Sequence, residues 1–168
     1  MTPSNSSGNA NLFRFMLVTG LMIGTLDGTA AIIDFITSYH GNPLIEFQYI
    51  AGGFLGIKTF SGGLPTALLG IFLHYLIATS WTVLFFLLYP KMKVLRMNWL
   101  FVGLVYAIFI WLVMNLIVRP LSLVPHVSWT TFKVFKSAAI LVVVVGSPIS
   151  FVARKFYSEN SNEHQPAA

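Results

Sequence analysis

The sequence predicts an all-α integral membrane protein, a four-helix bundle with a glycine-rich element between its first and second helices. Of its 168 residues, 56% are hydrophobic and only 9% are charged, whereas a soluble domain carries about 25% charged residues. The apolar residues form four runs, each long enough for the roughly 20 residues that a membrane-spanning helix needs. The runs lack strict alternation, which favours helices over the strands of a membrane barrel.

The four predicted spanning helices cover residues 15–38, 64–89, 98–118 and 132–156, and together they form one transmembrane domain over 15–156. The second and third helices contain no formally charged residue. Arg119 and Pro120 mark the end of the third helix. The polar segment 1–14 precedes a long apolar helix without a small-residue cleavage site, so we expect a retained anchor. We expect the polar tail 157–168 to be disordered.

A glycine-rich stretch, residues 41–63, separates the first two helices. It is too short and too rich in glycine for a stable spanning helix. We therefore expect an interfacial or re-entrant element that caps the bundle, and the sequence leaves these two alternatives open. Its glycines are Gly52, Gly53, Gly56, Gly62 and Gly63.

The distribution of Lys and Arg predicts the orientation. Cytoplasmic loops of membrane proteins carry an excess of these residues. With both termini in the cytoplasm, six of the ten cations lie inside, and three of them occupy the short loop between the second and third helices. The net charge of +5 lacks a dense basic run, so nucleic acid is not an expected partner. The six are Arg14, Lys91, Lys93, Arg96, Arg154 and Lys155.

The first predicted helix carries two acids, Asp27 and Asp34. A carboxylate in hydrocarbon costs roughly 2.5–3.5 kcal/mol unless it faces protein, water or a partner. On a helical projection both acids share one side with Gly20, Gly24 and Gly28. Glycines at four-residue spacing let helices approach closely, so this side is the expected packing face. Its partner is another helix of the chain or, alternatively, a second copy in a homo-oligomer.

His74 lies on a small-residue face of the second predicted helix. Counted from the cytoplasmic ends at 1.5 Å per residue, its depth matches that of Asp27. We therefore predict a buried pair of Asp27 and His74 near the middle of the membrane. Two roles remain open: a static hydrogen bond between helices, and a site that takes up and releases protons because histidine titrates near neutrality.

A second polar cluster is expected at the outer end of the helices. In one interpretation Asp34 pairs with Arg119 or a lysine, and the remaining cations reach lipid phosphates. In the other, the cluster is a basic vestibule for an anionic ligand or anionic lipid head group. We favour the first. His40, Glu46 and His126 lie in adjoining loops. The cluster consists of Asp34, Asn115, Arg119, Lys133 and Lys136.

Motifs of enzymes are missing from the sequence. Cysteine is absent, which excludes thiolate nucleophiles and Cys-ligated metals. The chain has no nucleophile elbow, no H-E-x-x-H and no kinase signature. No Lys-Ser/Thr follows the glycines as a phosphate-binding loop requires, and the histidines lack metal-ligand spacing. We therefore expect no catalytic residues, no metal and no cofactor.

Three stretches resemble the YagU-like family of small bacterial inner-membrane proteins. They are Ile50–Gly56 followed by Phe60–Gly63, then Leu69–Ala78 with His74, and Val113–Ser122 with Asn115, Arg119 and Pro120. With the four-helix layout, the resemblance covers about residues 15–155. It implies a four-pass protein of the bacterial inner (plasma) membrane and supplies almost no activity, since that family is largely uncharacterised.

The sequence thus favours a non-enzymatic multi-pass membrane protein whose main partner is the lipid bilayer. The first alternative is a small transporter or proton-coupled permeation protein, which would act as an oligomer because one four-helix unit is thin for alternating access. The second alternative is a membrane enzyme that acts on a lipid or quinone. The sequence does not identify a substrate.

Overall fold

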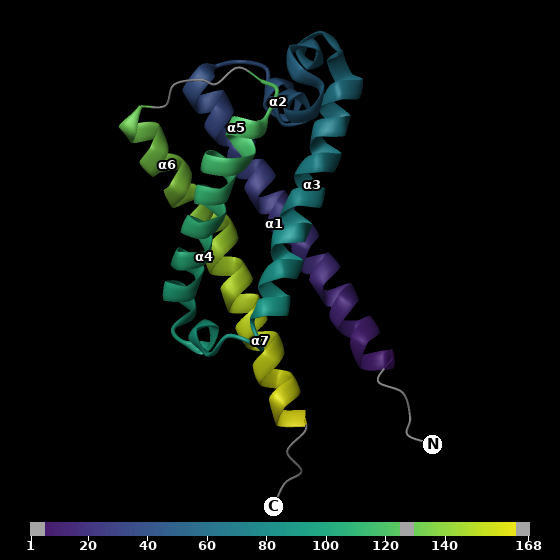
Figure 1. Cartoon of the computed structure of the whole chain (residues 1–168), viewed down its shortest axis with the longest axis vertical. Coiled ribbons are helices and arrows are strands. Elements are labelled where there is room, and N and C mark those ends of the chain that lie inside the picture. The colour runs from purple at the N-terminus through teal and green to yellow at the C-terminus, as the bar shows by residue number, and fades with distance from the viewer. Residues whose placement is uncertain (1–5, 125–129, 164–168) are drawn as a thin grey trace, which may run out of the picture.

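The computed structural model describes residues 6–124 and 130–163, and this part of the chain is entirely helical apart from its turns. Four helical stretches are long and apolar enough to cross a membrane: Asn11–Tyr39, Gly63–Leu88, Trp99–Leu121 and Thr131–Glu159. The prediction of an all-helical chain with four long apolar helices is therefore confirmed. Both termini lie at one end of the molecule and α2 (Leu44–Leu55) lies at the other (Figure 1).

Glycines bring the first two long helices together. Helix α1 (Ser6–Tyr39) packs along α3 (Gly63–Leu88), and a Cβ atom placed on Gly20 would lie 2.9 Å from the Cα atom of Thr79. A Cβ on Gly24 would lie 2.7 Å from the Tyr75 ring, and one on Gly28 would lie 3.1 Å from the His74 ring. We call these three residues the glycine seam. Its partner within this chain is α3.

The glycine-rich segment folds into α2 and the 3-10 helix η1 (Gly56–Ser61), and α2 packs on α3. A Cβ on Gly70 would lie 1.8 Å from the Phe47 carbonyl oxygen, so the two backbones touch. Gly56 ends α2 with a φ of 68°, a conformation that suits glycine. The Gln48 amide donates to the Gly63 carbonyl at 2.9 Å, which closes the turn into α3. The segment is therefore an ordered helical hairpin with α3.

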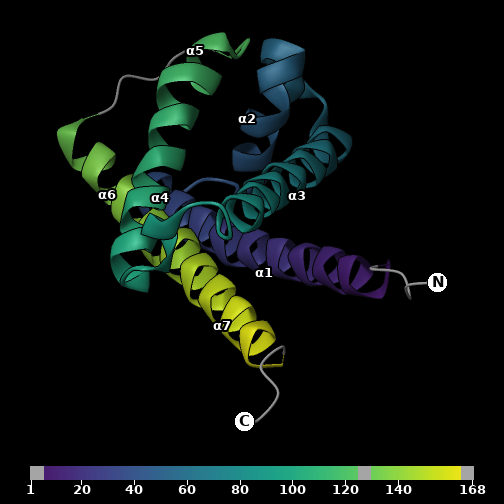
Figure 2. The same ribbon diagram turned by 60° about the horizontal axis from the view of Figure 1, so that its bottom comes forward.

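The last two long helices cross where Gly103 and Gly146 meet. Helix α4 (Trp99–Val113) packs against the π-helical turn η4 (Val142–Gly146) and α7 (Ser147–Glu163), as Figure 2 shows. A Cβ on Gly146 would lie 2.1 Å from the Gly103 carbonyl oxygen. A hydrogen bond of 2.8 Å from the Ser150 hydroxyl to the Trp99 carbonyl fixes the start of α4 on α7.

Two short helices and two irregular turns complete the chain. The loop after α3 contains η2 (Lys93–Arg96). Helix α4 continues through the π-helical turn η3 (Met114–Val118) into α5 (Arg119–Leu121), and α6 (Thr131–Leu141) leads into η4. The segment after α5 returns to α2, where the Leu123 amide donates to the Gly53 carbonyl at 3.2 Å. Gly52 leaves room for this segment beside α2, because a Cβ there would lie 2.5 Å from the Val124 side chain.

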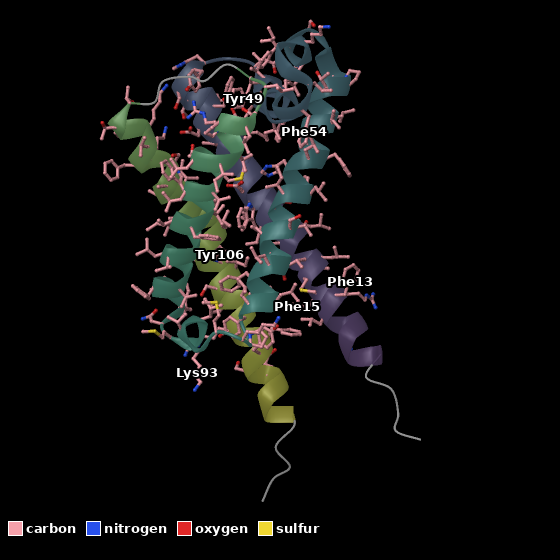
Figure 3. All side chains as sticks on the ribbon, in the orientation of Figure 1. Phe13, Phe15, Tyr49, Phe54, Lys93 and Tyr106 are labelled. Carbon is pink, nitrogen blue, oxygen red and sulfur yellow. The ribbon has the colours of Figure 1, made fainter. Side chains whose placement is uncertain are left out.

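The apolar core lies in the half of the molecule that carries the termini. Phe85 and Phe86 of α3 are fully buried there, together with Ile23 of α1 and Ile149 of α7. The Tyr106 hydroxyl donates to the Trp81 carbonyl at 2.6 Å, so this aromatic side chain is satisfied inside the core. Figure 3 shows Tyr106 between the end that bears Lys93 and the end that bears Tyr49 and Phe54.

The helix boundaries differ from the predicted ones at both termini. Helix α1 begins at Ser6, so part of the predicted polar segment 1–14 is helical. Helix α7 continues to Glu163, and residues 157–163 are therefore helical where we expect disorder. Packing explains the second difference, since the Tyr157 hydroxyl donates to the Phe86 carbonyl at 2.8 Å. The remaining predicted tail, 164–168, lies outside the described residues.

The contact between α2 and α3 predicts that alanine substitution lowers the stability at Gly70 and leaves it nearly unchanged at Gly53. Gly70→Ala places a methyl group against the Phe47 backbone, and overpacking of this kind costs about 1–3 kcal/mol. Gly53→Ala meets its nearest neighbour at 3.8 Å, an ordinary contact, and we expect a change within about 0.5 kcal/mol. Thermal unfolding in mild detergent compares the two variants. Equal melting temperatures would show that α2 and α3 are not in backbone contact.

Candidate functional site

The side chain of His74 lies between α1 and α3, at the glycine seam. Its ring is buried, with an exposed fraction of 9%, and Nε2 lies 2.8 Å from the Gly24 carbonyl oxygen. Because a carbonyl oxygen only accepts, Nε2 carries the hydrogen and Nδ1 of a neutral ring is the acceptor. The absence of a side chain at Gly24 and Gly28 makes room for this ring. The Phe47 ring of α2 packs edge-on against the His74 ring, with the ring centres 6.1 Å apart.

Asp27, the predicted partner of His74, is half-buried on α1 and interacts electrostatically with the His74 ring. The ring's hydrogen bond goes instead to the backbone of α1 at Gly24. Asp27 has no salt bridge among the described residues. The structure therefore brings the two side chains into each other's electrostatic field without a direct bond. Their expected depth at the middle of a membrane stays a prediction.

Glu46, near the start of α2, adds a third carboxylate to this region. Burial raises the pKa of Glu46 above its ordinary value of 4.5, and the negative charges of Asp34 and then Asp27 raise it further. Like Asp27, Glu46 has no salt bridge within the part of the chain that the structure describes. Three of the chain's five acids thus act on one another at this end of the molecule.

Asp34 lies two helical turns beyond Asp27 and has a cationic partner. Lys136 of α6 forms an ion pair with its carboxylate, and the same ammonium group donates to the Ser38 hydroxyl at 3.2 Å. Lys133, one turn earlier on α6, donates to the Tyr39 hydroxyl at 2.9 Å. Its ammonium group also lies 4.5 Å from the centre of the Tyr39 ring. These contacts connect the end of α1 to the start of α6.

The other two members of the predicted outer cluster, Asn115 and Arg119, lie on the helix formed by α4, η3 and α5. The Asn115 amide donates to the Trp111 carbonyl at 2.9 Å within its own helix. The Arg119 carbonyl accepts from the Ser122 hydroxyl at 2.7 Å. Of the five predicted members, the structure thus brings together Asp34, Lys133 and Lys136, at the end of α1. His126, named as a neighbour of this cluster, lies outside the described residues.

We define the polar cluster as the five ionisable side chains that lie together in the half that carries α2. Sequence reasoning missed one of them as a member, because Glu46 was placed in a loop adjoining the outer cluster. The signal was present, since a carboxylate in an otherwise apolar, glycine-rich segment requires the same explanation as Asp27. The polar cluster consists of Asp27, Asp34, Glu46, His74 and Lys136.

A cavity of about 220 Å³ lies beside His74, in the groove between α1 and α3. The Tyr75 hydroxyl and the Thr25 hydroxyl, 3.0 Å apart, line it together with Thr29. Both threonine hydroxyls donate to carbonyls of α1, to Leu21 and Thr25 respectively. The groove therefore opens beside the His74 ring, and its lining combines these hydroxyls with the apolar side chains of Ile32, Phe47 and Ile71.

The chemistry available to the polar cluster is proton exchange. Carboxylates and imidazole are acids and bases, and burial beside like charges changes how readily they take up protons. Among the described residues, no three His, Asp or Glu side chains are placed to hold a metal ion. The cluster also contains no hydroxyl or amine activated by a neighbouring base, which nucleophilic catalysis requires.

Comparisons with known proteins yield no match for this chain among family models, curated proteins or solved structures. The resemblance to the YagU-like family therefore stays a prediction.

The raised pKa of Glu46 predicts how stability changes with pH. The folded protein holds the Glu46 proton more tightly than the unfolded chain, so this group favours folding fully below pH 4.5. Its contribution decreases as the pH rises from there through the folded pKa. We expect Glu46→Gln to remove this decrease, so that the variant exceeds the wild type in melting temperature only at the higher pH.

Melting temperatures of both proteins, measured from pH 4 to pH 9 in mild detergent, test this expectation. Glu159→Gln provides the control, because Glu159 is an exposed acid on α7 that makes only a weak pair at 3.9 Å with Lys155. A constant difference between Glu46→Gln and the wild type at every pH would contradict a raised pKa.

Proposed function

We propose that this chain is a non-enzymatic, four-pass protein of the bacterial inner membrane, with both termini in the cytoplasm, and that it binds protons at the polar cluster. We further propose that it acts as a proton-coupled permeation unit. The observation that carries this proposal is the electrostatic coupling of Glu46 to Asp34 and Asp27, and of Asp27 to His74, in a chain with only five acids. Ionisable groups inside membrane helices generally mark ion or proton pathways.

The charge balance of the cluster supports proton binding. With all three carboxylates ionised, Lys136 compensates one of them through its ion pair with Asp34. Asp27 and Glu46 then have no ion pair among the described residues, and Asp27 lies beside the His74 imidazole. Uncompensated charge is costly in a low-dielectric site, and uptake of a proton relieves the cost. Glu46 is the member most suited to this uptake, because burial and two neighbouring acids already raise its pKa.

The arrangement of the groups supports a path along the molecule. Glu46 lies on α2, at the end opposite the termini. Asp27 and His74 lie deeper, towards the apolar core of Phe85 and Phe86. A proton taken up at Glu46 therefore has acceptors further along α1 and α3. The core blocks continuation within a single resting chain, so permeation requires motion of α1 against α3 or a second copy.

A second candidate function is that of a structural or accessory membrane protein. Two contacts favour it: the hydrogen bond from His74 to the Gly24 carbonyl and the ion pair of Lys136 with Asp34. Each connects two helices that are distant in sequence. In this case the ionisable groups only fix the register of the helices, and their titration has no further consequence.

Proton flux into proteoliposomes, followed with an enclosed pH-sensitive dye, separates the two functions. We expect flux in the wild type and a fall to the level of empty liposomes in Asp27→Asn, His74→Ala and Glu46→Gln, because each removes a group that takes up protons. Glu159→Gln removes a remote acid and should leave the flux unchanged.

Folding of each variant is checked by its circular dichroism and its elution volume in detergent. Flux that is unchanged in folded Asp27→Asn and His74→Ala would remove the proposed role of the cluster. A wild type without flux, together with a lower melting temperature in His74→Ala, would favour the structural function instead, because His74 makes one of the contacts between helices.

A further inference from the structure

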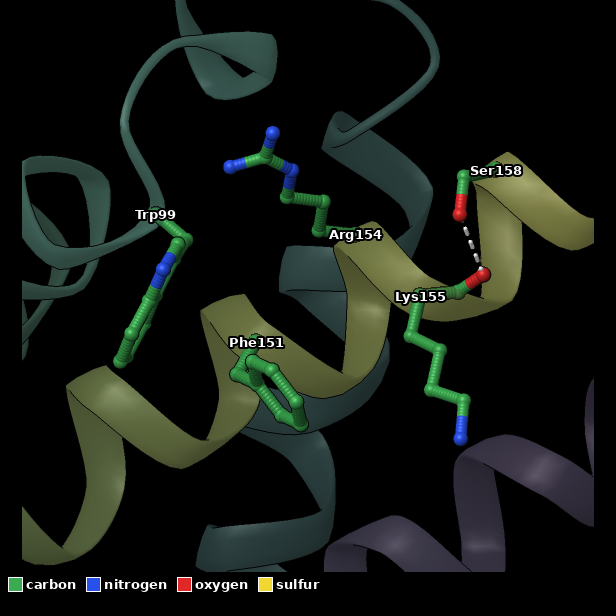
Figure 4. Close-up of a pocket in the computed structure, with 5 residues that line it drawn as sticks. All are labelled: Trp99, Phe151, Arg154, Lys155 and Ser158. Carbon is green, nitrogen blue, oxygen red and sulfur yellow. Dashed lines mark hydrogen bonds between the residues drawn. The ribbon is translucent and has the colours of Figure 1, made fainter.

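A second pocket lies at the opposite end from the polar cluster, between the start of α4 and the last turns of α7 (Figure 4). Its volume is about 260 Å³, below the roughly 300–1,000 Å³ of sites for drug-sized ligands. We call it the basic pocket. It is lined by Trp99, Phe151, Arg154, Lys155 and Ser158.

We propose that the basic pocket binds the phosphate head group of an anionic phospholipid. The inference rests on the proposed membrane insertion and is independent of proton binding at the polar cluster. Three features of the pocket support this assignment: its apolar wall, the charges at its edge and its level on the helices.

The apolar wall consists of two aromatic rings. Trp99 and Phe151 pack edge to face, with ring centres 5.5 Å apart. The hydrogen bond from Ser150 to the Trp99 carbonyl fixes α4 to α7 beside them. Phe151 remains half exposed, at 50%. This wall suits the glycerol and upper acyl carbons of a lipid, and tryptophan is characteristic of the head-group level of membrane proteins.

The cations at the edge are free to bind a phosphate. Arg154 has no hydrogen bond or ion pair to any side chain that the structure describes, and Lys155 reaches Glu159 only at 3.9 Å with both side chains about two-thirds exposed. At the other end of the molecule, by contrast, Lys136 pairs with Asp34 and Lys133 with Tyr39. The basic pocket therefore combines two cations that lack a close ion pair among the described residues with an aromatic wall.

The level of the pocket along the helices fits a head group. Arg154 and Lys155 lie in the last turns of the candidate span Thr131–Glu159, and Trp99 begins the span Trp99–Leu121. Long basic side chains at such positions extend their charge to the lipid phosphates. Figure 4 shows that the Arg154 and Lys155 side chains leave α7 in opposite directions, so each offers a separate cationic contact at the edge of the pocket.

Native mass spectrometry of the delipidated full-length protein tests the proposal, with phosphatidylglycerol and phosphatidylcholine as the added lipids. We expect saturable binding of phosphatidylglycerol only. The double variant Arg154→Gln/Lys155→Gln should bind it about 25-fold more weakly, since each basic residue near an anionic surface contributes about a factor of five. The charge-matched control Lys91→Gln/Lys93→Gln lies at the same end of the molecule and should bind like the wild type.

Two further measurements distinguish loss of the pocket's charge from misfolding, and lipid binding from binding of free phosphate. Arg154→Lys retains the charge and should retain most of the binding even if the double variant fails to fold. Inorganic phosphate at millimolar concentration should not compete, because it cannot use the aromatic wall. Equal binding of both lipids, equal losses in the two double variants, or full displacement by inorganic phosphate would each overturn the proposal. A lack of proton flux would leave this result unaffected.

Discussion

The close contact between α1 and α3 determines where the polar groups of this protein lie. Gly24 and Gly28 provide the space that the His74 ring occupies, and the Gly24 carbonyl accepts its hydrogen bond. With α3 held at this distance, α2 packs onto α3 at Gly70 and carries Glu46 towards Asp27 and Asp34. A larger side chain in the glycine seam would therefore alter the electrostatics of residues that it does not touch.

The molecule separates two kinds of interior along its length. Around Phe85 and Phe86, aromatic rings fill the space, tyrosine hydroxyls bond to carbonyls, and the described part of this core contains no buried charged side chain. The half that carries α2 contains the five ionisable side chains of the polar cluster, one of which, His74, lines the groove between α1 and α3. Dense apolar packing gives rigidity, whereas a cluster with surplus carboxylates can respond to pH. The two regions together favour a rigid base with a responsive end.

The sequence predicted the parts of this structure that depend on local pattern. Long apolar runs specified the four helices, and the spacing of Gly20, Gly24 and Gly28 indicated a packing face on α1. Depth counting along two helices placed Asp27 near His74. It could not reveal that the ring bonds to the Gly24 carbonyl, because the ring reaches that carbonyl only where glycines leave room for it. The position of Glu46 depends on how α2 folds back over α3. No local pattern encodes that contact.

The ion pair between α1 and α6 has a consequence for the biosynthesis of the chain. Lys136, which pairs with Asp34, also bonds to Ser38, 98 positions earlier in the sequence. At a translation rate of about 5–20 residues per second, this partner is made roughly 5–20 s after the first helix. Under the proposed membrane insertion, a nascent α1 carries an acid without its Lys136 partner until the fourth apolar helix is made. The proposal therefore implies that the translocation machinery, water or a proton shields Asp34 in the meantime.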